Sequence, residues 1–389
     1  MNVLLGITGS IAAYKSLELV RLLKKEGADV KVMLTQSALH FVTPLSCQTL
    51  SGNEIFKEQF MLTEGIKHLT LADWADIFVI APASANIIGK AASGIGDDLL
   101  STTLLSFQKA ILFVPAMDEG MWQNKIVQKN VHELKREGVH FLEPSSGLLA
   151  SGKVGKGRFP RCSLVYKKML IVLEKTDSLQ GTKFLVTGGR TEEDIDSVRV
   201  ITNRSSGMMA VELLETVVCR EGEVKGILGE VNVPLPEEME IMRVRTSHEM
   251  LKVLRENVSW CHCLIMAAAV GDYKPRSRHS TKVHTEKIHC ELHKNKDILK
   301  EVNKHKGKRV YVGFSLEDTI DQKRARKKLQ AKKLDIIVVN PVQAIGSNHV
   351  SAHILTKGGR ITQIGKATKA RLANKILDEC MHVLGKKKR

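Results

Sequence analysis

The chain has 389 residues, of which 43% are hydrophobic and 4% aromatic, and its formal net charge is +17. This length and apolar content are typical of a globular protein with two domains. No apolar run of about eighteen residues is present, which argues against a membrane-spanning helix. Seven scattered cysteines favour a reduced, cytoplasmic protein over a disulfide framework.

The positive charge raises the question of nucleic acid binding. Basic residues are spread along the chain, with local clusters at 323–333 and 386–389, and no aromatic residues are interleaved with them. Solvated helix faces account for most of these lysines, and a positive field also attracts nucleotides and phosphorylated substrates. We therefore expect small anionic ligands, with neither nucleic acid nor membrane as a partner.

Short apolar segments alternate with helical patterns through the first half of the chain. The expected strands cover residues 3–7, 30–34, 77–81 and 111–114. This alternation predicts a doubly wound, mostly parallel sheet whose ligand lies at the carboxyl ends of the strands. Small and hydroxyl residues gather there and suit a phosphate and a flat polar ring: Gly9, Ser10, Thr35, Ser84, Asn86 and Ser101.

Together these turns resemble the flavin-containing cysteine decarboxylases, a family of homo-oligomers. The matching segments are Gly9-Ser10-Ile11, His68-Leu69, 82–86, 115–122 and a late substrate flap at 149–157. The resemblance implies a flavodoxin-like or Rossmann-like flavoprotein domain over residues 1–180, with FMN bound between subunits, commonly in trimers. The residues implied to bind FMN are Gly9, Ser10, Ile11, Thr35, Ser84, Asn86, Ser101 and Met117.

The implied reaction begins with oxidation of the substrate thiol by FMN. The resulting thioaldehyde lets the neighbouring carboxylate leave as CO₂, and the ene-thiol is then reduced with a proton from a flap cysteine. His68 is the implied acid/base, because imidazole titrates near neutral pH. The alternative for His68 is an ordinary histidine on the surface of a helix.

Two implied catalytic positions depart from the family pattern. Asp118 stands where the family has Asn, and an ionised carboxylate there would repel the substrate carboxylate. Ser151 stands where the flap has Cys, and a hydroxyl is a far poorer proton donor than a thiol with a pKa of about 8.5. Cys162 is a candidate substitute donor for which the sequence offers no geometric argument.

A polar linker precedes a second expected open sheet, over residues 181–389. Its first strand ends at Gly188-Gly189, where backbone N–H groups can approach an anion. A second polar turn, Asn203 to Gly207, precedes an apolar helical pattern. Spacing alone leaves two interpretations open: a phosphate pocket, or an ordinary connection between a strand and a helix.

This stretch resembles the start of the phosphopantothenate–cysteine ligase half of the bacterial bifunctional coenzyme A biosynthesis flavoproteins. The shared signature runs from Asn203 to Met209, with Met208 in place of a family lysine. Residues 267–273 and 312–317 match further family runs, and 287–290 match a lysine-rich strap of which only Lys287 is kept. The residues implied to bind the nucleotide are Gly188, Gly189, Ser206, Gly207, Ala268, Asp272, Lys287, Phe314, Lys328 and Lys332.

The resemblance also assigns roles. Asn203 and Lys287 are implied to be catalytic, Asn203 and Arg204 to bind phosphopantothenate, and Asp272 to hold the ribose or Mg²⁺. The implied chemistry is attack of the 4′-phosphopantothenate carboxylate on CTP, followed by displacement of CMP by the cysteine amine, in a dimeric ligase half. From the residues alone, Asp272 is equally well a plain turn residue, and Lys328 and Lys332 a solvated helix face.

A third pattern, Cys261-His262-Cys263, has the residue types of a metal site. It lies in an apolar run leading to 265–267, where alternate side chains point to opposite faces of a strand. We expect a buried strand, with a metal site as the alternative.

The sequence as a whole predicts an α/β protein of two fused, mostly parallel sheets, and the resemblance implies an enzyme that makes 4′-phosphopantetheine using FMN, CTP and Mg²⁺. Four substitutions keep two alternatives open: Asp118, Ser151, Met208 and His289. One alternative is a ligand-binding or regulatory homologue, and the other is an active ligase beside a defective decarboxylase.

Overall fold

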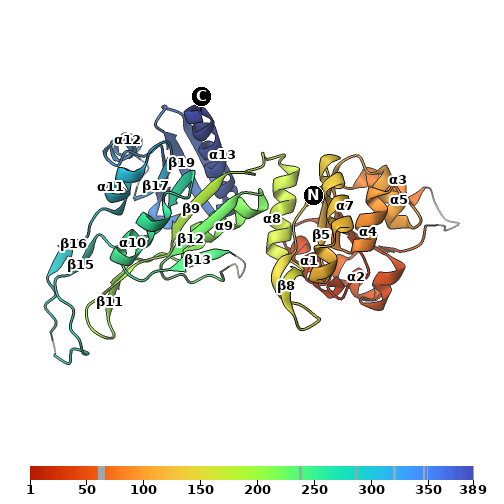
Figure 1. Cartoon of the computed structure of the whole chain (residues 1–389), viewed down its shortest axis with the longest axis horizontal. Coiled ribbons are helices and arrows are strands. Elements are labelled where there is room, and N and C mark those ends of the chain that lie inside the picture. Colours follow the sequence, from red (N-terminus) through yellow and green to blue (C-terminus); the bar gives the residue numbers. More distant parts are fainter. Residues whose placement is uncertain are drawn as a thin grey trace. The chain divides into compact units, whose positions relative to one another are not determined.

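The computed structural model describes residues 1–59, 66–235, 239–285, 287–318, 321–344, 347 and 349–388. The chain divides into two compact units, Met1–Thr176 and Asp177–Arg389 (Figure 1). Within the described residues, no helix combines the length and the apolar character needed to cross a membrane.

The sheet of the first unit has six parallel strands in the order β3-β2-β1-β4-β5-β6. The strands are β1 (Asn2–Ile7), β2 (Asp29–Leu34), β3 (Ile55–Phe56), β4 (Ile77–Ala83), β5 (Ala110–Pro115) and β6 (His140–Phe141). The strand order reverses between β1 and β4, which makes this a Rossmann-type sheet with a ligand-binding switch point at that place. The expected doubly wound fold is confirmed.

Helices cover both faces of this sheet. On one face α1 (Ala13–Lys25) packs against α8 (Cys162–Leu173). The other face is covered by α3 (Lys67–Trp74), α4 (Ala85–Ala92), α5 (Leu99–Ser106) and α7 (Lys125–Arg136), whose apolar side chains join Phe78, Ile80 and Phe113 in one core. The remaining helical segments are η1 (Gln36–His40), α2 (Pro44–Ser51) and α6 (Glu119–Trp122).

A separate antiparallel hairpin, β7 (Ser145–Leu148) and β8 (Val154–Arg158), carries the predicted substrate flap at its turn. Gly152, in that turn, has a φ of +80°, which a glycine adopts without strain.

The sheet of the second unit has eight strands in the order β13-β12-β9-β14-β17-β18-β19-β20. The strands are β9 (Lys183–Gly188), β12 (Glu223–Leu228), β13 (Glu240–Arg243), β14 (Cys263–Met266), β17 (Val310–Glu317), β18 (Ile336–Pro341), β19 (His349–Thr356) and β20 (Ile361–Thr368). The first six are parallel and repeat the Rossmann order, so this second expected sheet is also confirmed.

The last two strands are each antiparallel to the preceding neighbour. Two reversals bring β20 back to the direction of the parallel strands. Helix α13 (Lys369–Lys388) therefore begins at the same edge of the sheet as the carboxyl ends of those strands.

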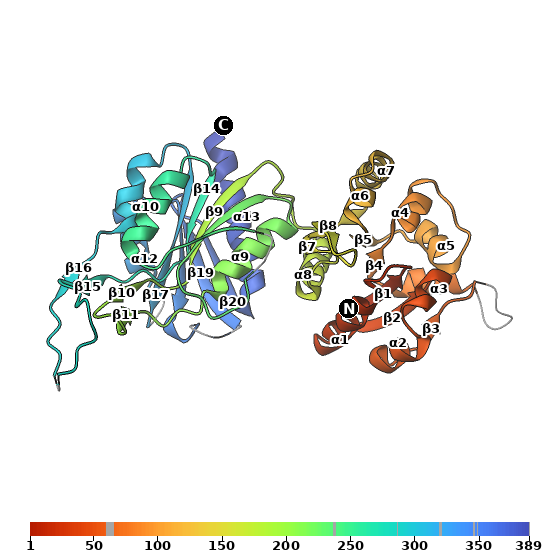
Figure 2. The same ribbon diagram turned by 60° about the horizontal axis from the view of Figure 1, so that its bottom comes forward.

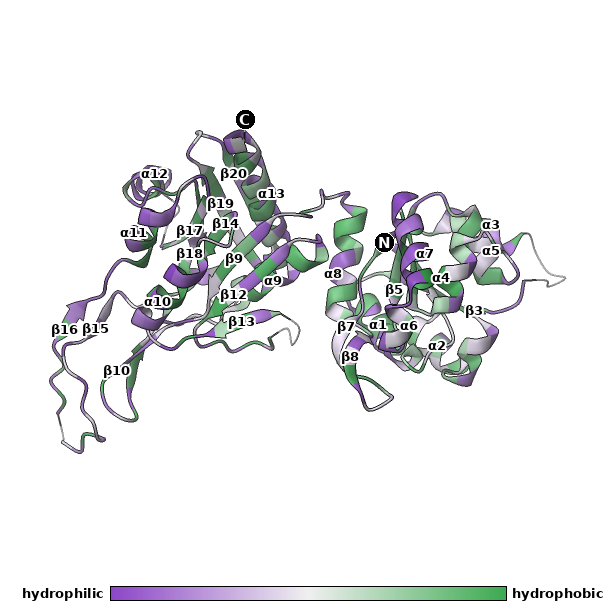
Figure 3. Cartoon of the chain, viewed as in Figure 1, coloured by the Kyte–Doolittle hydropathy of each residue, from purple (hydrophilic) through white to green (hydrophobic). Residues whose placement is uncertain are grey.

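Two helical layers enclose the second sheet (Figure 2). Helices α9 (Met208–Cys219) and α13 cover the face that carries Val186 and Val312, whereas α10 (Ser247–Asn257), α11 (Ile298–Val302) and α12 (Gln322–Ala331) cover the face with Leu185 and Tyr311. Alternate residues of one strand thus enter opposite cores. Figure 3 shows the hydrophobic colour along β9 and the hydrophilic colour on α10.

The remaining elements of this unit are two hairpins and two short helical turns. They are β10 (Glu192–Asp194) with β11 (Val200–Thr202), β15 (Tyr273–Pro275) with β16 (Leu292–Lys294), η2 (Asn303–His305) and η3 (Val342–Ala344).

The segment Cys261-His262-Cys263 leads into β14, which begins at Cys263 and is buried along its four residues. His262 uses its Nδ1 to accept a hydrogen bond of 3.1 Å from the Lys183 backbone amide. The prediction of a buried strand is confirmed from Cys263 onward. In the part of the chain that the structure describes, no cluster of three or more His, Cys, Asp or Glu side chains is placed to hold a metal ion.

Candidate functional site

The carboxyl ends of β1 and β4 are tied together by Thr8. Its hydroxyl donates a hydrogen bond of 2.7 Å to the Pro82 carbonyl and accepts one of 3.0 Å from the Ser84 amide. The hydroxyl of Ser10 donates to the Ala116 carbonyl at 3.2 Å, which brings in the loop after β5. Three strand ends at the switch point therefore meet in one hydrogen-bonded edge.

Most of the predicted flavin-binding residues lie at this edge. Gly9 is packed against η1, because a Cβ added to it would come within 2.5 Å of the Ser37 Cβ. Ser84 occupies the N-cap position of α4 but makes no side-chain bond to that helix. The others at strand ends or in the following turn are Ser10, Ile11, Thr35, Asn86 and Met117.

Ser101 has a different role. It is 1% exposed and forms a reciprocal capping box with Asp98 at the start of α5, where Ser101 Oγ donates to Asp98 Oδ1 at 2.8 Å. The same Oγ accepts from the backbone amides of Asp97 and Asp98, at 3.1 Å each. This hydroxyl is therefore engaged in stabilising a helix end.

The donor set of this edge fits FMN. Neutral hydroxyls and backbone amides at the start of a helix suit a phosphate. Ile11, which is 59% exposed, offers an apolar surface next to these donors. The residues that would hold the flavin phosphate and ring are thus Gly9, Ser10, Ile11, Ser84 and Asn86.

Two glycines allow the flap hairpin to pack closely against the segment after β5. A Cβ on Gly157 would overlap the Met117 carbonyl, and one on Gly155 would overlap the Glu119 carboxylate. The Met117 amide donates to the Gly157 carbonyl at 3.0 Å, and the Lys156 amide donates to Glu119 Oε1 at 3.0 Å. Only residues without a side chain allow this close approach.

As a result, the two substituted positions face each other. Ser151 Oγ donates a hydrogen bond of 3.4 Å to Asp118 Oδ2. The other carboxylate oxygen, Oδ1, accepts from the Gly120 amide at 2.9 Å and caps α6. The structure thus brings together two residues that lie 33 positions apart in the sequence.

His68 and Cys162 lie outside this pair. His68 is half-buried in the first turn of α3, and in the described part of the chain it makes no hydrogen bond to Ser151 or Asp118. Cys162 begins α8, where its Sγ lies 3.5 Å from the Lys15 carbonyl and burial raises its pKa to about 11. The suggestion that Cys162 replaces the flap cysteine therefore finds no support in its position.

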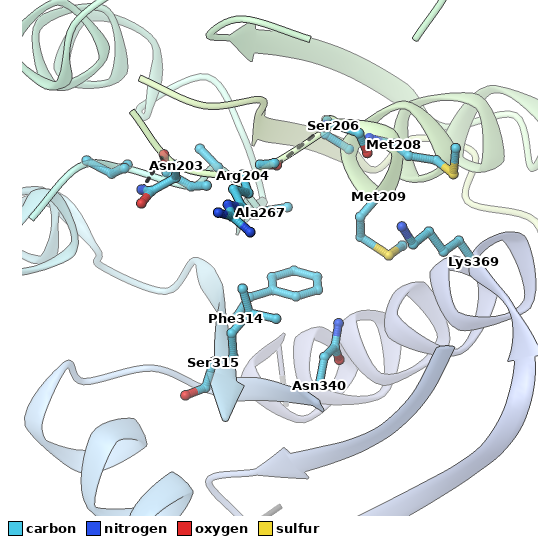
Figure 4. Close-up of a pocket in the computed structure, with 17 residues that line it drawn as sticks. Asn203, Arg204, Ser206, Met208, Met209, Ala267, Phe314, Ser315, Asn340 and Lys369 are labelled. Atoms are coloured by element: carbon cyan, nitrogen blue, oxygen red, sulfur yellow. Dashed lines mark hydrogen bonds between the residues drawn. The ribbon is translucent and has the colours of Figure 1, made fainter. Parts of the chain in front are cut away.

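The second unit contains a pocket of about 350 Å³ at the carboxyl edge of its sheet (Figure 4). The lining comes from the turn before α9 and its first residues (203–210), the loop after β14 (267–270), the end of β17 (314–316), and two single residues, Asn340 and Lys369. The pocket therefore collects segments from along most of the unit's length.

Six of the predicted ligase residues line this pocket: Asn203, Arg204, Ser206, Gly207, Ala268 and Phe314. The Asn203 side chain donates to the Ala269 carbonyl at 3.2 Å, which joins the turn before α9 to the loop after β14. Gly207 has a φ of +76° and is the N-cap residue of α9. The free backbone N–H groups at the beginning of that helix therefore lie at the pocket. Met208, the substituted position, also lines it.

The Gly188-Gly189 turn supports the pocket without lining it. A Cβ on Gly188 would overlap the Ala210 side chain, and Gly189 has a φ of +74°. Arg190, next in the chain, donates from its Nη1 to the Ser205 carbonyl at 3.1 Å. This contact fixes the turn before α9, and it was not anticipated from the sequence.

The two predicted lysines near the end of α12 differ, and Lys332 is the residue that follows the helix as its C-cap. Lys328 Nζ donates to Ser315 Oγ at 2.9 Å, and Ser315 lines the pocket. Burial lowers the pKa of Lys328, and the neighbouring Lys332 lowers it further. Lys332 pairs with Asp297 at 3.3 Å. Lys328 is therefore one side chain away from the pocket, whereas Lys332 is engaged with a carboxylate.

Asp272 and Lys287 are not among the residues that line the pocket. The charge of Asp272 acts on Lys328 and raises its pKa, in opposition to burial. Lys287 is exposed in the segment between β15 and β16.

Asn340 and Lys369 line the pocket, although neither was predicted as a site residue. They were missed because a single residue at a strand end or a helix start carries no local signal of a site.

Two family models match the chain. The model described as "Flavoprotein" matches residues 1–172, and "DNA/pantothenate metabolism flavoprotein C-terminal domain" matches residues 179–384. The coenzyme A biosynthesis bifunctional protein CoaBC of Bacillus subtilis (strain 168) is 37% identical over 389 residues, covering 97% of this chain and 96% of the relative. The CoaBC protein of Haemophilus influenzae is 35% identical over 388 residues, covering 97% and 96%. A crystal structure of the C-terminal domain of CoaBC aligns with a TM-score of 0.48 and 30% identity, covering 54% of this chain and 100% of that one.

Proposed function

The chain belongs to the family of bifunctional coenzyme A biosynthesis proteins, and we propose that its two units catalyse the two reactions of that family in succession. The second unit joins cysteine to 4′-phosphopantothenate at the expense of CTP. The first unit decarboxylates the product to 4′-phosphopantetheine with FMN. The pocket formed by the Asn203–Gly207 turn and Phe314 is the observation that carries the ligase assignment.

In the ligase reaction, the 4′-phosphopantothenate carboxylate attacks the α-phosphate of CTP, pyrophosphate leaves, and an acyl-cytidylate forms. Asn203 and Arg204 are the residues proposed to orient the carboxylate and the phosphates, and their position in the pocket lining beside the start of α9 supports this role. The amine of cysteine then attacks the acyl carbon and CMP leaves. Positioned donors and cations of this kind stabilise the charge of the transferring phosphoryl group.

Mg²⁺ would enter with the triphosphate, because this ion is usually held by phosphates with one or two carboxylates. Asp272, in the loop after β14, is the proposed carboxylate, as the family resemblance implies. Lys328, Lys332 and Lys287 are the proposed cations for the triphosphate.

In the decarboxylase reaction, Gly9, Ser10, Ile11, Ser84 and Asn86 would hold FMN at the β1–β4 edge, where it would supply the redox chemistry of the reaction. His68 is the proposed acid/base for the substrate thiol. Asp118 and Ser151 meet the substrate carboxylate and the ene-thiol at the flap. The Ser151 hydroxyl is directed at Asp118, and this contact favours a second candidate, in which an active ligase is joined to a decarboxylase that completes its last step poorly.

We further propose a cytoplasmic homo-oligomer, with trimeric flavoprotein halves and dimeric ligase halves, that acts on small molecules and not on nucleic acid. The seven cysteines are all free thiols, in keeping with a reducing compartment.

One assay tests these functions together. The full chain is supplied with FMN, 4′-phosphopantothenate, cysteine and CTP-Mg²⁺, and pyrophosphate, CO₂ and 4′-phosphopantetheine are followed. All three products support the bifunctional enzyme. Pyrophosphate without 4′-phosphopantetheine supports the second candidate, and the absence of pyrophosphate contradicts the ligase assignment.

A further inference from the structure

The hydroxyl of Ser315 links a lysine of α12 to a carboxylate of β17. Its Oγ donates to Glu317 Oε1 at 2.6 Å and accepts from Lys328 Nζ at 2.9 Å. The direction of this chain of hydrogen bonds is fixed, because an ammonium only donates and an ionised carboxylate only accepts. The single proton of the hydroxyl therefore points to Glu317, and one of its lone pairs points to Lys328.

The fold places these groups on one face of the sheet. Ser315 and Glu317 are two residues apart on β17, so both side chains point toward α12. Arg324 and Lys328 are four residues apart on α12 and meet the strand together. Arg324 Nη1 lies 3.2 Å from Glu317 Oε2 and so occupies the second carboxylate oxygen. Because Ser315 is 1% exposed and Glu317 is 7% exposed, this carboxylate is a buried, fixed anchor.

This anchor holds Lys328 beside the pocket. Among the described residues, Ser315 Oγ is the acceptor that the ammonium contacts, which leaves two of its N–H groups for a ligand. Ser315 belongs to the pocket lining, but Figure 4 shows its hydroxyl directed away from the Phe314 ring. The hydroxyl is therefore placed to act on a ligand through Lys328.

Charged groups from several elements surround Lys328. Burial and the neighbouring cations lower its pKa, and two carboxylates oppose this effect. The cations are Lys332 and Arg324, and the carboxylates are Glu317 and Asp272. A hydrogen bond to the protonated amine also favours the charged form. Ser315 supplies that bond and connects the amine to one of the carboxylates that keep it charged.

Building on the proposed binding of CTP, we propose that Ser315 is a positioning residue that keeps Lys328 charged and directed at the triphosphate, with Glu317 as its anchor. A free lysine side chain has many conformations, and holding it in place beforehand reduces the entropy lost when a ligand binds. A carboxylate paired directly with the lysine would compete with phosphate for the cation, as Asp297 does at Lys332. A neutral hydroxyl between the two charges competes far less.

The test measures binding of CTP and of inorganic tripolyphosphate to the full chain, from neutral pH to about 10.4, the ordinary pKa of lysine. In wild type the affinity should fall as the pH rises through the pKa of Lys328. In Ser315→Ala the affinity at neutral pH should be about two- to tenfold weaker, the equivalent of one hydrogen bond. The alkaline fall should also begin at a lower pH, because the bond that favours the charged amine is lost.

Two further variants serve as controls. Ser315→Thr keeps the hydroxyl and should restore the alkaline profile of wild type. Ser259→Ala removes the hydroxyl of an exposed serine outside the pocket and should leave both the affinity and its pH dependence unchanged. Combining Ser315→Ala with Lys328→Met should add nothing to the effect of Lys328→Met alone, because the serine acts through the lysine.

The outcomes separate this role from the proposed ligase. Wild-type protein that binds neither CTP nor tripolyphosphate contradicts the ligase itself. An equal loss of affinity at every pH in Ser315→Ala overturns the positioning role, since general loosening of the pocket would do the same. Additive losses in the double variant overturn it too. If Ser315→Ala fails to fold, Glu317→Gln keeps an acceptor for the hydroxyl but removes the charge. The alkaline fall should again move to lower pH, and an unmoved fall overturns the proposal.

Discussion

The hydroxyl of Ser151 donates a hydrogen bond of 3.4 Å to the carboxylate of Asp118. Both residues depart from the pattern of the decarboxylases that the sequence resembles. The structure shows that these two substitutions are in contact with each other. A serine that donates to a carboxylate directs its proton away from a substrate carbon. From this pair we expect a decarboxylase that releases CO₂ more readily than it completes the reduction.

Replacing Ser151 with Cys should restore the closing step. A thiol with a pKa of about 8.5 is a far better proton donor than a hydroxyl. With 4′-phosphopantothenoylcysteine as substrate, the yield of 4′-phosphopantetheine per CO₂ should rise. Ser146→Cys, on the exposed side of the same hairpin, is the control and should leave the ratio as it is. An unchanged ratio in Ser151→Cys would count against the flap assignment.

Asp118→Asn should improve binding of the carboxylate substrate. Asparagine keeps an oxygen that can cap α6 by accepting from Gly120, but it removes the negative charge. Two like charges about 4 Å apart in water repel by about 1 kcal/mol, or roughly fivefold in affinity. Steady-state release of CO₂ should therefore show a lower KM. Asp73→Asn, an exposed change at the far end of α3, should not alter it. An equal or higher KM in Asp118→Asn would contradict the idea of repulsion.

Gly157→Ala should loosen the flap. The added Cβ overlaps the Met117 carbonyl, and forced overpacking of this kind costs about 1–3 kcal/mol. A lower melting temperature and faster proteolysis within 145–158 are expected. Gly89→Ala is the matched control, because the nearest atom to its Cβ is Asn130 Nδ2 at 3.8 Å. Equal melting temperatures for the two variants would show that the hairpin is not seated as described.

Lys328→Met should weaken CTP binding about tenfold or more, because the charged hydrogen bond to phosphate that we propose for this lysine is lost. The pH dependence follows from burial, which places the pKa of Lys328 below 10.5. Phosphate binds the protonated form, so affinity is complete below that pKa and falls as pH rises through it. Lys328→Met should lack this alkaline fall. The exposed neighbour Lys327→Met should retain it, and an alkaline limb that persists in Lys328→Met would exclude this lysine.

The sheets were predictable because parallel strands are buried on both faces and appear as short apolar runs. β1, β4, β9 and β18 are of this kind. The two-residue strands β3 and β6 were missed, since Ile55–Phe56 and His140–Phe141 are too short to show a period. Strand order was also beyond prediction, because it depends on which connections cross the sheet.

The ligase pocket was only partly predictable. The turn Asn203–Gly207 and Phe314 are marked by composition and by the family resemblance, and they meet in the pocket. Asn340 and Lys369 line the pocket, and Arg190 holds its Ser205 turn, only because the fold brings them there from distant parts of the sequence. A lysine at the start of a helix looks like a surface residue in a sequence, and only the packing of α13 against α9 shows that it is enclosed.

The antiparallel pair β19–β20 has a consequence for how this unit can change. Each added antiparallel strand reverses the direction of the chain. An even number of such strands therefore returns the start of the final helix to the edge where the ligand pocket lies. Loss or gain of a single strand would deliver the first residue of α13 to the opposite rim, some distance from any nucleotide. Further strands at this end of the sheet should therefore leave the start of α13 at the ligand edge only when they are added in pairs.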